Sequence, residues 1–518
     1  MTKAKIVCAV CLFSVLYFPF ASKPVHIDDA NFLMLSEGAA QDPWRPHDVV
    51  INWDGESKPA FEILANPPGI AWYLLPVRNS SEWIMHAWMQ PWFVLGAWGC
   101  WQLGKEFTDG AGFLATLYLL TCPVIVISTH ALTPDLPVFA CMVAGIGGFI
   151  AFPRYQCWFA MLAGSAALFR YSGCTAIPLL ILIGWVRHGR FGVARAMLSV
   201  IPILLLIGHD LHAYGRIHLF AMVASQNDAQ KKTAFDALHN CVAGVGMLGG
   251  AGVLPVLIWR RETLFAAICG SVIGMNVAWF SGLNLVQAIP AILFITSGVT
   301  ALSLAIVPCI RDPILTAWSL GGAAFFYFVA FAATRYWAAF APGVGLLAIR
   351  NAQNSSRWLV AGIVINTLIS FSLAFDDQNF AQVHKDAAQR VATLGTGTFS
   401  GHWGWQHYLQ KAGWTPIERG SEPGTLHAFA AFGDSKRLES TTCLRLKERY
   451  SYSDHWPGPR AYSWYNRAFY HAGGRRSYSP WTLSNEPYDV ISVSRRCDAE
   501  ATDAGAVIAE ESDEAAAE

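Results

Sequence analysis

Hydrophobic and polar positions in this chain form long blocks. Apolar runs of roughly 14 to 22 residues recur between residues 5 and 375, and short polar breaks separate them. Because the hydrocarbon core of a bilayer takes about 20 apolar residues of helix, each run predicts a membrane-spanning helix. We expect about thirteen spans, near residues 5–21, 86–104, 111–128, 136–152, 157–169, 173–186, 196–213, 239–259, 263–281, 284–308, 314–333, 336–350 and 357–375.

The short loops between these runs alternate in charge. If the N-terminus, with Lys3 and Lys5, is cytoplasmic, the tight turns "STHALTPD" and "SGLN" lie outside and carry no Lys or Arg. Every loop on the cytoplasmic side then carries at least one of Lys105, Arg154, Arg187, Arg190, Arg195, Arg260, Arg261, Arg311, Arg350 and Arg357. The positive-inside rule therefore predicts a multi-pass membrane protein with a cytoplasmic N-terminus and an extracytoplasmic C-terminus.

The first run is also open to interpretation as a cleaved signal peptide. Its apolar core is slightly long for one, and "PFASKP" is a poor cleavage site. We therefore favour a membrane anchor.

A large loop at residues 22–85 lies outside the predicted spans. Within and just after it, "ANFLMLSEGAA" and "EWIMHAWMQPW" predict short amphipathic helices in the membrane interface. The spans and this loop together form a predicted transmembrane domain at residues 1–375.

The second region outside the spans is the C-terminal part of the chain. Residues 376–498 predict a small extracytoplasmic α/β domain: "GHWGWQHYLQKAGW" is typical of a turn and a helix, and "TTCLRLKERYSYS" and "YDVISVSRRC" of strands. The acidic, Ala-rich residues 499–518 predict a disordered tail. The aromatic residues of this domain predict a packed core, with sugar or membrane stacking as the alternative: Trp403, Trp405, Tyr408 and Trp414.

Composition agrees with an all-α polytopic membrane protein. About 54% of the residues are hydrophobic and 14% are charged, and the net charge is zero, so nothing points to nucleic acid as a partner. The twelve cysteines show no metal-type spacing. Cys443 and Cys497 are the only two in the C-terminal region, where an oxidising compartment favours a disulfide between them.

Carboxylates stand at the predicted outer ends of two spans. Asp28 and Asp29 follow the first span, and Asp135 opens the fourth. Ionisable residues near membrane depth are costly and usually face a cavity or a partner. Helix capping is the simpler alternative, but a cap needs only one carboxylate, so it leaves the second member of the pair unexplained.

Other polar residues share the same predicted face. His209 and Asp210 are either a satisfied polar pair or part of a cavity or divalent-metal site. Arg170 and Arg335, each followed by Tyr, either snorkel to the interface or bind a lipid-linked phosphate through their forked donors. The element "NPPGIAWYLLP", with Asn66, Pro67 and Pro68, fixes a non-helical entry to an apolar segment, and a plain turn would do the same.

The order of these features resembles one family. An acidic pair follows the first span, a Pro-Pro element lies later in the same outer loop, an acid opens the fourth span, and "TRYWAAFAPGVGLLAI" comes late in the chain. The chain resembles the polyprenyl-phosphate-sugar-dependent glycosyltransferases of the protein O-mannosyltransferase and lipid A aminoarabinose transferase type. The resemblance covers about residues 1–375 and implies the C-type glycosyltransferase fold.

The resemblance also implies an activity. A hexosyl- or pentosyltransferase of this type transfers one sugar, with inversion, from a polyprenyl phosphate to a lipid, glycan or protein acceptor outside the cytoplasmic membrane. Asp28 matches the first acid of the family's Asp-Glu pair and is implied as the general base. Asp29 stands where Glu is usual, and its reach is shorter.

Three further positions are implied by the resemblance, and one departs from it. Asp135 matches the family's second acid, and Arg335 and Tyr336 match the late Arg-Tyr that points at the donor phosphate. Asn66 stands where His or Lys commonly precedes Pro-Pro, so the donor contact of that charge is not implied here. Arg170 aligns with no family position that we can identify.

The chemistry of the residues agrees with such a transfer. A carboxylate base takes the acceptor proton, and positive charge stabilises the departing phosphate. A transporter or lipid flippase is the alternative, since it also concentrates charge in an outward-facing cavity, but neither an inverted repeat nor midplane charges are visible. A third interpretation is an assembly protein whose membrane charges are dispensable. The sequence names neither the sugar nor the acceptor, and it leaves a divalent metal open.

Overall fold

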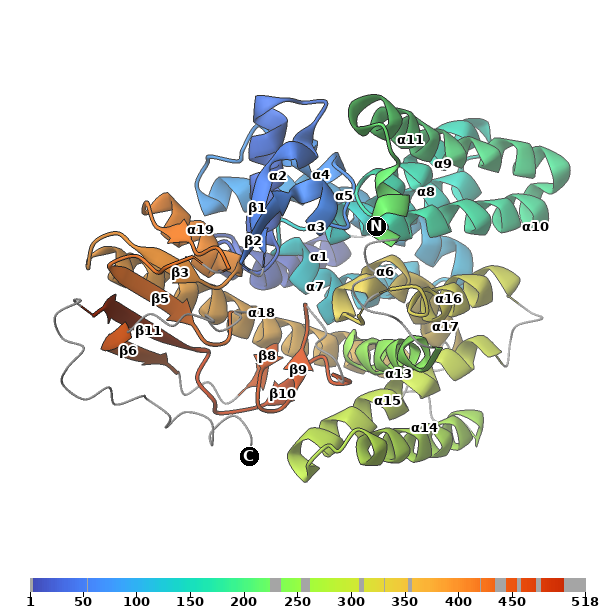
Figure 1. The fold of residues 1–518 in the computed structure, drawn as a ribbon. Coiled ribbons are helices and arrows are strands. Elements are labelled where there is room, and N and C mark those ends of the chain that lie inside the picture. Colours follow the sequence, from blue (N-terminus) through green and yellow to red (C-terminus); the bar gives the residue numbers. More distant parts are fainter. Residues whose placement is uncertain are drawn as a thin grey trace.

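The structure is a computed structural model. It describes residues 3–497 apart from 54, 224–233, 253–260, 307–311, 330, 353–355, 420, 434–443, 454–457 and 472–476. The described chain is mostly helical and ends in a mixed β-sheet (Figure 1). The predicted tail at 499–518 lies outside the described residues.

The N-terminal half contains long and broken helices. They are α1 (Lys3–Tyr17), η1 (Phe18–Phe20), α5 (Glu82–Phe107), α6 (Gly112–Thr121), α7 (Pro123–Thr129), α8 (Asp135–Ala151), η3 (Pro153–Tyr155), α9 (Gln156–Gly164), η4 (Ser165–Leu168), η5 (Tyr171–Thr175), α10 (Ala176–Ala196), η6 (Met197–Val200) and α11 (Ile201–Tyr214). Helices α6 and α7 are bent by 64° because Cys122, which precedes Pro123, is held in an extended conformation. Gly189, at φ 60° and ψ −151°, breaks α10 between two of the predicted spans.

The second half continues with α13 (Ala234–Gly250), α14 (Arg261–Phe280), α15 (Leu285–Ile306), α16 (Pro313–Phe325), η8 (Thr334–Ala339), α17 (Ala341–Ala352) and α18 (Ser356–Ala392). In the described part of the chain, four helices are long and apolar enough to cross a membrane, or five if α6 and α7 form one span. Several apolar spans are therefore present, but the predicted number of about thirteen is not confirmed, since many apolar runs are divided by prolines, glycines or 3₁₀ turns.

The predicted outer loop is a folded unit. It comprises α2 (Asp29–Gln41), η2 (Pro46–Asp48), the hairpin of β1 (Val50–Trp53) and β2 (Glu56–Pro59), α3 (Ala60–Ile63) and α4 (Gly69–Leu74). The first predicted amphipathic helix is α2, and most of its residues are buried. The second is wrong as a separate interfacial helix, because residues 82–92 run without a break into α5.

The C-terminal sheet has the strand order β4-β3-β5-β11-β6. Its strands are β3 (Thr398–Ser400), β4 (Thr415–Pro416), β5 (Leu426–Ala430), β6 (Leu444–Tyr452) and β11 (Asp489–Arg496). Strand β3 is parallel to β4 and β5, whereas β11 is antiparallel to β5 and β6. The short pairs are β7 (Pro459–Arg460) with β10 (Thr482–Leu483), and β8 (Tyr462–Ser463) with β9 (Ala468–Phe469).

Helix α19 (Trp403–Lys411) packs beside this sheet, at the position predicted for a helix. The side chains of Trp403, Trp405 and Trp414 are buried, and Tyr408 is half-buried, which agrees with a packed core. The predicted boundary at residue 376 falls inside α18, which continues from the apolar segment toward the sheet (Figure 1). We call residues 393–497, which follow this helix, the C-terminal region.

Candidate functional site

Five of the predicted site residues lie together. Arg335 forms an ion pair with Asp28, and Arg170 forms one with Asp135. The Tyr336 ring joins the two pairs, because the guanidinium carbons of Arg170 and Arg335 lie 4.3 and 5.8 Å from its centroid. These residues come from four separate segments of the chain, and we call them the acidic site.

Asp28 is the most accessible carboxylate of the acidic site. Its side chain is 22% exposed, whereas that of Asp135 is 2% exposed. Asp28 precedes α2, and the residue before it, Ile27, has a φ of 45°. Such a conformation is strained for a β-branched residue, so its surroundings must hold it in place. The Ile27 side chain packs in a buried cluster with Phe380 of α18 and Trp403 of α19.

Asp29 lies in a different environment from Asp28. It is fully buried, and its two carboxylate oxygens accept hydrogen bonds from the backbone N–H of His26 (3.2 Å) and of Leu132 (2.8 Å). Leu132 lies three residues before Asp135, so Asp29 ties the segment of one acid to the segment of the other. Burial raises the pKa of Asp29 to about 6.

Helix capping by this pair is wrong. The N-cap position of α2 is Asp28, and its side chain makes no capping hydrogen bond. Asp135 is the first residue of α8, whose N-cap is Pro134, so it also does not cap with its side chain. Oxygen Oδ2 of Asp135 is buried without a hydrogen-bond partner among the described residues.

Arg335 lies in η8, which carries the "TRY" of the sequence motif. Burial alone would lower the pKa of its guanidinium, but the carboxylates of Asp28 and Asp135 raise this pKa above its ordinary value. Both carboxylates therefore stabilise the positive charge of Arg335. Arg170 lies in extended backbone between η4 and η5 and keeps 14% of its side chain exposed.

The Pro-Pro element lies close to the Arg170 segment. Pro67 and Pro68 are buried, and Asn66 is half-buried, with its carbonyl 2.9 Å from Nε2 of His47. A Cβ on Gly69 would come within 2.3 Å of the Leu168 carbonyl oxygen, so α4 and η4 approach as closely as a glycine allows.

His209 and Asp210 form a satisfied polar pair. Nδ1 of His209 lies 3.3 Å from Oδ1 of Asp210, and its Nε2 lies 2.9 Å from the Trp44 carbonyl oxygen. The other oxygen of Asp210 accepts the backbone N–H of His218 at 3.0 Å. Within the described residues, no group of three or more His, Cys, Asp or Glu side chains is placed to hold a metal ion.

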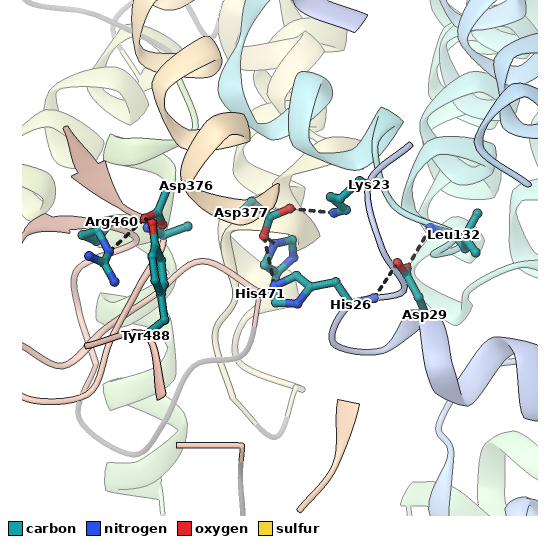
Figure 2. A network of polar contacts seen from close by, with 10 residues as sticks. Lys23, His26, Asp29, Leu132, Asp376, Asp377, Arg460, His471 and Tyr488 are labelled. Carbon is teal, nitrogen blue, oxygen red and sulfur yellow. Dashed lines mark hydrogen bonds and ion pairs between the residues drawn. The ribbon is translucent and has the colours of Figure 1, made fainter. Parts of the chain in front are cut away.

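A second polar cluster escaped the sequence interpretation (Figure 2). Asp377 of α18 contacts Lys23 (2.6 Å), His26 (3.3 Å) and His471 (2.8 Å), and all four side chains are at least 92% buried. The neighbouring Asp376 pairs with Arg460 at 2.8 Å and accepts hydrogen bonds from the Tyr488 hydroxyl (2.8 Å) and the Ala461 N–H (2.6 Å). We call these residues the buried cluster. Its signal in the sequence was the adjacent acids of "AFDDQNF" after the last predicted span.

Cys497 is disulfide-bonded. Cys443 lies outside the described residues, so its pairing with Cys497 stays a prediction.

An apolar cavity of about 610 Å³ lies between α15, the end of α13, Ile369 of α18 and strand β10. Its lining includes Ile289, Leu293, Phe294 and Leu483. None of the predicted site residues lines it.

Comparison with known proteins gives structural similarity only. No family model matches the chain, and no curated protein matches its sequence. The fold is similar to ArnT from Cupriavidus metallidurans bound to undecaprenyl phosphate, with a TM-score of 0.41 and 14% identity over 82% of this chain and 93% of that chain. For ArnT in the apo state the TM-score is 0.40, with 12% identity over 94% of this chain and 97% of that chain. The similarity thus spans most of both chains at low sequence identity.

Proposed function

We propose that the protein is a membrane glycosyltransferase. It transfers one monosaccharide, with inversion, from a polyprenyl-phosphate donor to an acceptor hydroxyl at the extracytoplasmic face of the inner membrane. The observation that carries this proposal is the convergence of two carboxylates and two guanidiniums around the Tyr336 ring. In the same topology the N-terminus is cytoplasmic and the C-terminal region is extracytoplasmic.

The two guanidiniums are the proposed phosphate ligands. Arg170 and Arg335 present planar, forked donors, which suit a phosphate group. Each is paired with a carboxylate, so a phosphate that binds Arg335 competes with Asp28 for it. Donor binding would then release Asp28 from its ion pair and leave it free to act as a base.

In the proposed step, the acceptor oxygen attacks the anomeric carbon while its proton passes to Asp28. The bond from the anomeric carbon to the phosphate oxygen breaks, and its electron pair leaves with the polyprenyl phosphate. The guanidiniums stabilise the charge that develops on that oxygen. Asp135 orients Arg170, and Asn66, Pro67 and Pro68 shape the neighbouring wall of the donor site.

The test is an assay of purified protein with a panel of labelled polyprenyl-phosphate sugars. Asp28→Asn should lower the transfer rate by about 10²- to 10⁴-fold, since it removes a general base. Asp48→Asn is the matched control, because Asp48 lies in the same outer loop, forms an ion pair with Arg45 and is 46% exposed. Undecaprenyl phosphate, the lipid in the similar ArnT structure, serves as the competing ligand, and a chelator arm tests for a metal requirement.

The outcomes separate the alternatives. Full activity of Asp28→Asn would show that the base is another residue. If the wild-type protein neither transfers nor hydrolyses any donor of the panel, the enzyme proposal fails and lipid transport becomes the leading function.

A further inference from the structure

Asp377 is the point where three segments of the chain meet (Figure 2). Lys23 and His26 come from the segment before the acidic pair, Asp377 from α18, and His471 from the C-terminal region. Nζ of Lys23 lies 2.6 Å from Oδ2 of Asp377, while the ring nitrogens of His26 and His471 approach Oδ1 at 3.3 and 2.8 Å. One buried carboxylate thus holds the N-terminal segment against the C-terminal region.

The contact to His26 reaches the acidic site through the backbone. The N–H of His26 donates to Asp29, whose other oxygen accepts from Leu132 near Asp135. Between His26 and Asp28 stands Ile27 with its φ of 45°, a conformation that relaxes once its surroundings release it. A shift of the His26 ring would therefore change where Asp28 points.

The C-terminal region also contacts the segment of Arg335, the partner of Asp28 in the ion pair. The backbone carbonyl of Tyr470 accepts the N–H of Thr334 at 3.1 Å, and Thr334 immediately precedes Arg335. Tyr470 itself is fully buried. Tyr470 thus contacts the residue before Arg335, and His471 shares Asp377 with His26, which lies two residues before Asp28.

We infer that Asp377 and His471 are positioning residues for the acidic site, so that the C-terminal region completes this site without touching the substrate. The inference rests on the proposed function for its kinetic consequence, but its structural consequence is independent of any activity. The competing interpretation is a buried ion pair that only contributes to stability. A comparison of Asp377 with the adjacent Asp376 separates the two interpretations. Asp376 is equally buried, but its ion-pair and hydrogen-bond partners in the described part of the chain, Arg460, Ala461 and Tyr488, all lie in the C-terminal region.

The experiment compares Asp377→Asn with Asp376→Asn in the full-length, detergent-solubilised protein. Hydrogen exchange of residues 24–32 and of residues 459–471 is followed by mass spectrometry. We expect Asp377→Asn to lose protection in residues 24–32, and Asp376→Asn to lose it in 459–471 alone. In the transfer assay, Asp377→Asn should lower kcat by about 10- to 100-fold, as expected for a small misplacement of a catalytic group, with a smaller change in KM for the donor.

A second pair of variants, with smaller changes, keeps the test decisive if an aspartate variant does not fold. His471→Ala removes the contact to Asp377, whereas Tyr488→Phe removes only the hydroxyl that donates to Asp376. Exchange in residues 24–32 should rise in His471→Ala and not in Tyr488→Phe. His471→Gln, whose amide can still donate to Asp377, should restore protection and kcat.

Unchanged exchange of residues 24–32 in both Asp377→Asn and His471→Ala would overturn the inference. Equal loss of protection in both segments for the variants and their controls would also overturn it, because that result indicates general destabilisation. If the wild-type protein transfers no sugar, the proposed function fails, and the exchange data alone still decide whether Asp377 and His471 position residues 24–32.

Discussion

Two pairs of adjacent aspartates follow the first and the last predicted spans, and the structure uses them differently. In the first pair, Asp28 keeps 22% of its side chain exposed and shares Arg335, while Asp29 is buried on backbone N–H groups. In the second pair, Asp376 and Asp377 are both at least 98% buried and paired with cations. Accessibility and a shared, replaceable partner suit a reacting group, whereas complete burial with several fixed partners suits a structural one.

The acidic site and the buried cluster also differ in how their carboxylates are paired with other groups. In the acidic site, one oxygen of Asp135 is left without a partner in the described part of the chain, and two cations crowd one aromatic ring. Such an arrangement leaves room for an anionic ligand to be exchanged for a carboxylate. In the buried cluster, Asp377 and Asp376 each contact three groups through ion pairs or hydrogen bonds, and these contacts leave little room for a ligand.

The largest predicted effect concerns the buried cluster. Asp376→Asn should lower the free energy of unfolding by about 3–5 kcal/mol, because it removes the charged member of the fully buried Asp376–Arg460 ion pair. Thermal or denaturant unfolding of the solubilised protein measures this loss. Asp28→Asn should cost clearly less stability, since the site of Asp28 is partly open to water and Asp135 still faces Arg335. Equal losses for the two variants would break the distinction between the two pairs.

The sequence predicted more of the acidic site than of the buried cluster. Span counting placed Asp28, Asp135 and Arg335 at one face, because residues at the same end of successive helices share a side of the membrane. It did not predict that Arg170 and Arg335 share the Tyr336 ring, since this depends on side-chain packing. Helix capping was the alternative for the acidic pair, but α2 has no side-chain cap, and Asp29 accepts backbone hydrogen bonds from His26 and Leu132.

The buried cluster was missed for a physical reason. Lys23 and Asp377 are 354 residues apart, and neither lies in a pattern that indicates the other. The motif "FDDQNF" ends an apolar run, and the end of such a run predicts the end of the membrane-spanning helix. Helix α18 instead continues to Ala392, because its polar extension packs against α19 and the sheet, and that packing is a tertiary effect.

The second prediction concerns the proposed phosphate ligand. Arg335→Lys should lower kcat by about 100-fold, or about 2.7 kcal/mol of transition-state stabilisation, because an ammonium is a point charge without the planar, forked donors with which a guanidinium binds a phosphate. Steady-state kinetics with a donor that the wild-type protein accepts measures this loss. Arg45→Lys is the control, as Arg45 is a 48% exposed arginine of the outer loop. Wild-type kcat in Arg335→Lys would mean that any cation suffices at this position.

The smallest predicted effect is a pH dependence in which His26 and Asp29, hydrogen-bonded neighbours that link the two sites, oppose each other. Burial lowers the pKa of His26 to about 4 from an ordinary 6.5, so the unfolded chain takes up this proton first and His26 makes stability fall as pH drops from 6.5 to 4. Burial raises the pKa of Asp29 to about 6, so the unfolded chain releases this proton first and Asp29 makes stability fall as pH rises from about 4 to 6.

The two contributions therefore partly cancel near pH 5, and single variants should unmask them. His26→Gln should make the free energy of unfolding depend less steeply on pH between 4.5 and 6, and Asp29→Asn should make it depend more steeply, each by at most about 1.4 kcal/mol per pH unit. Other buried histidines with lowered pKa values, such as His47 and His427, keep the underlying slope positive in both variants. Slopes that change in the same direction would mean that either His26 or Asp29 is charged, and not neutral, in the folded protein near pH 5, which would contradict the direction of its pKa shift.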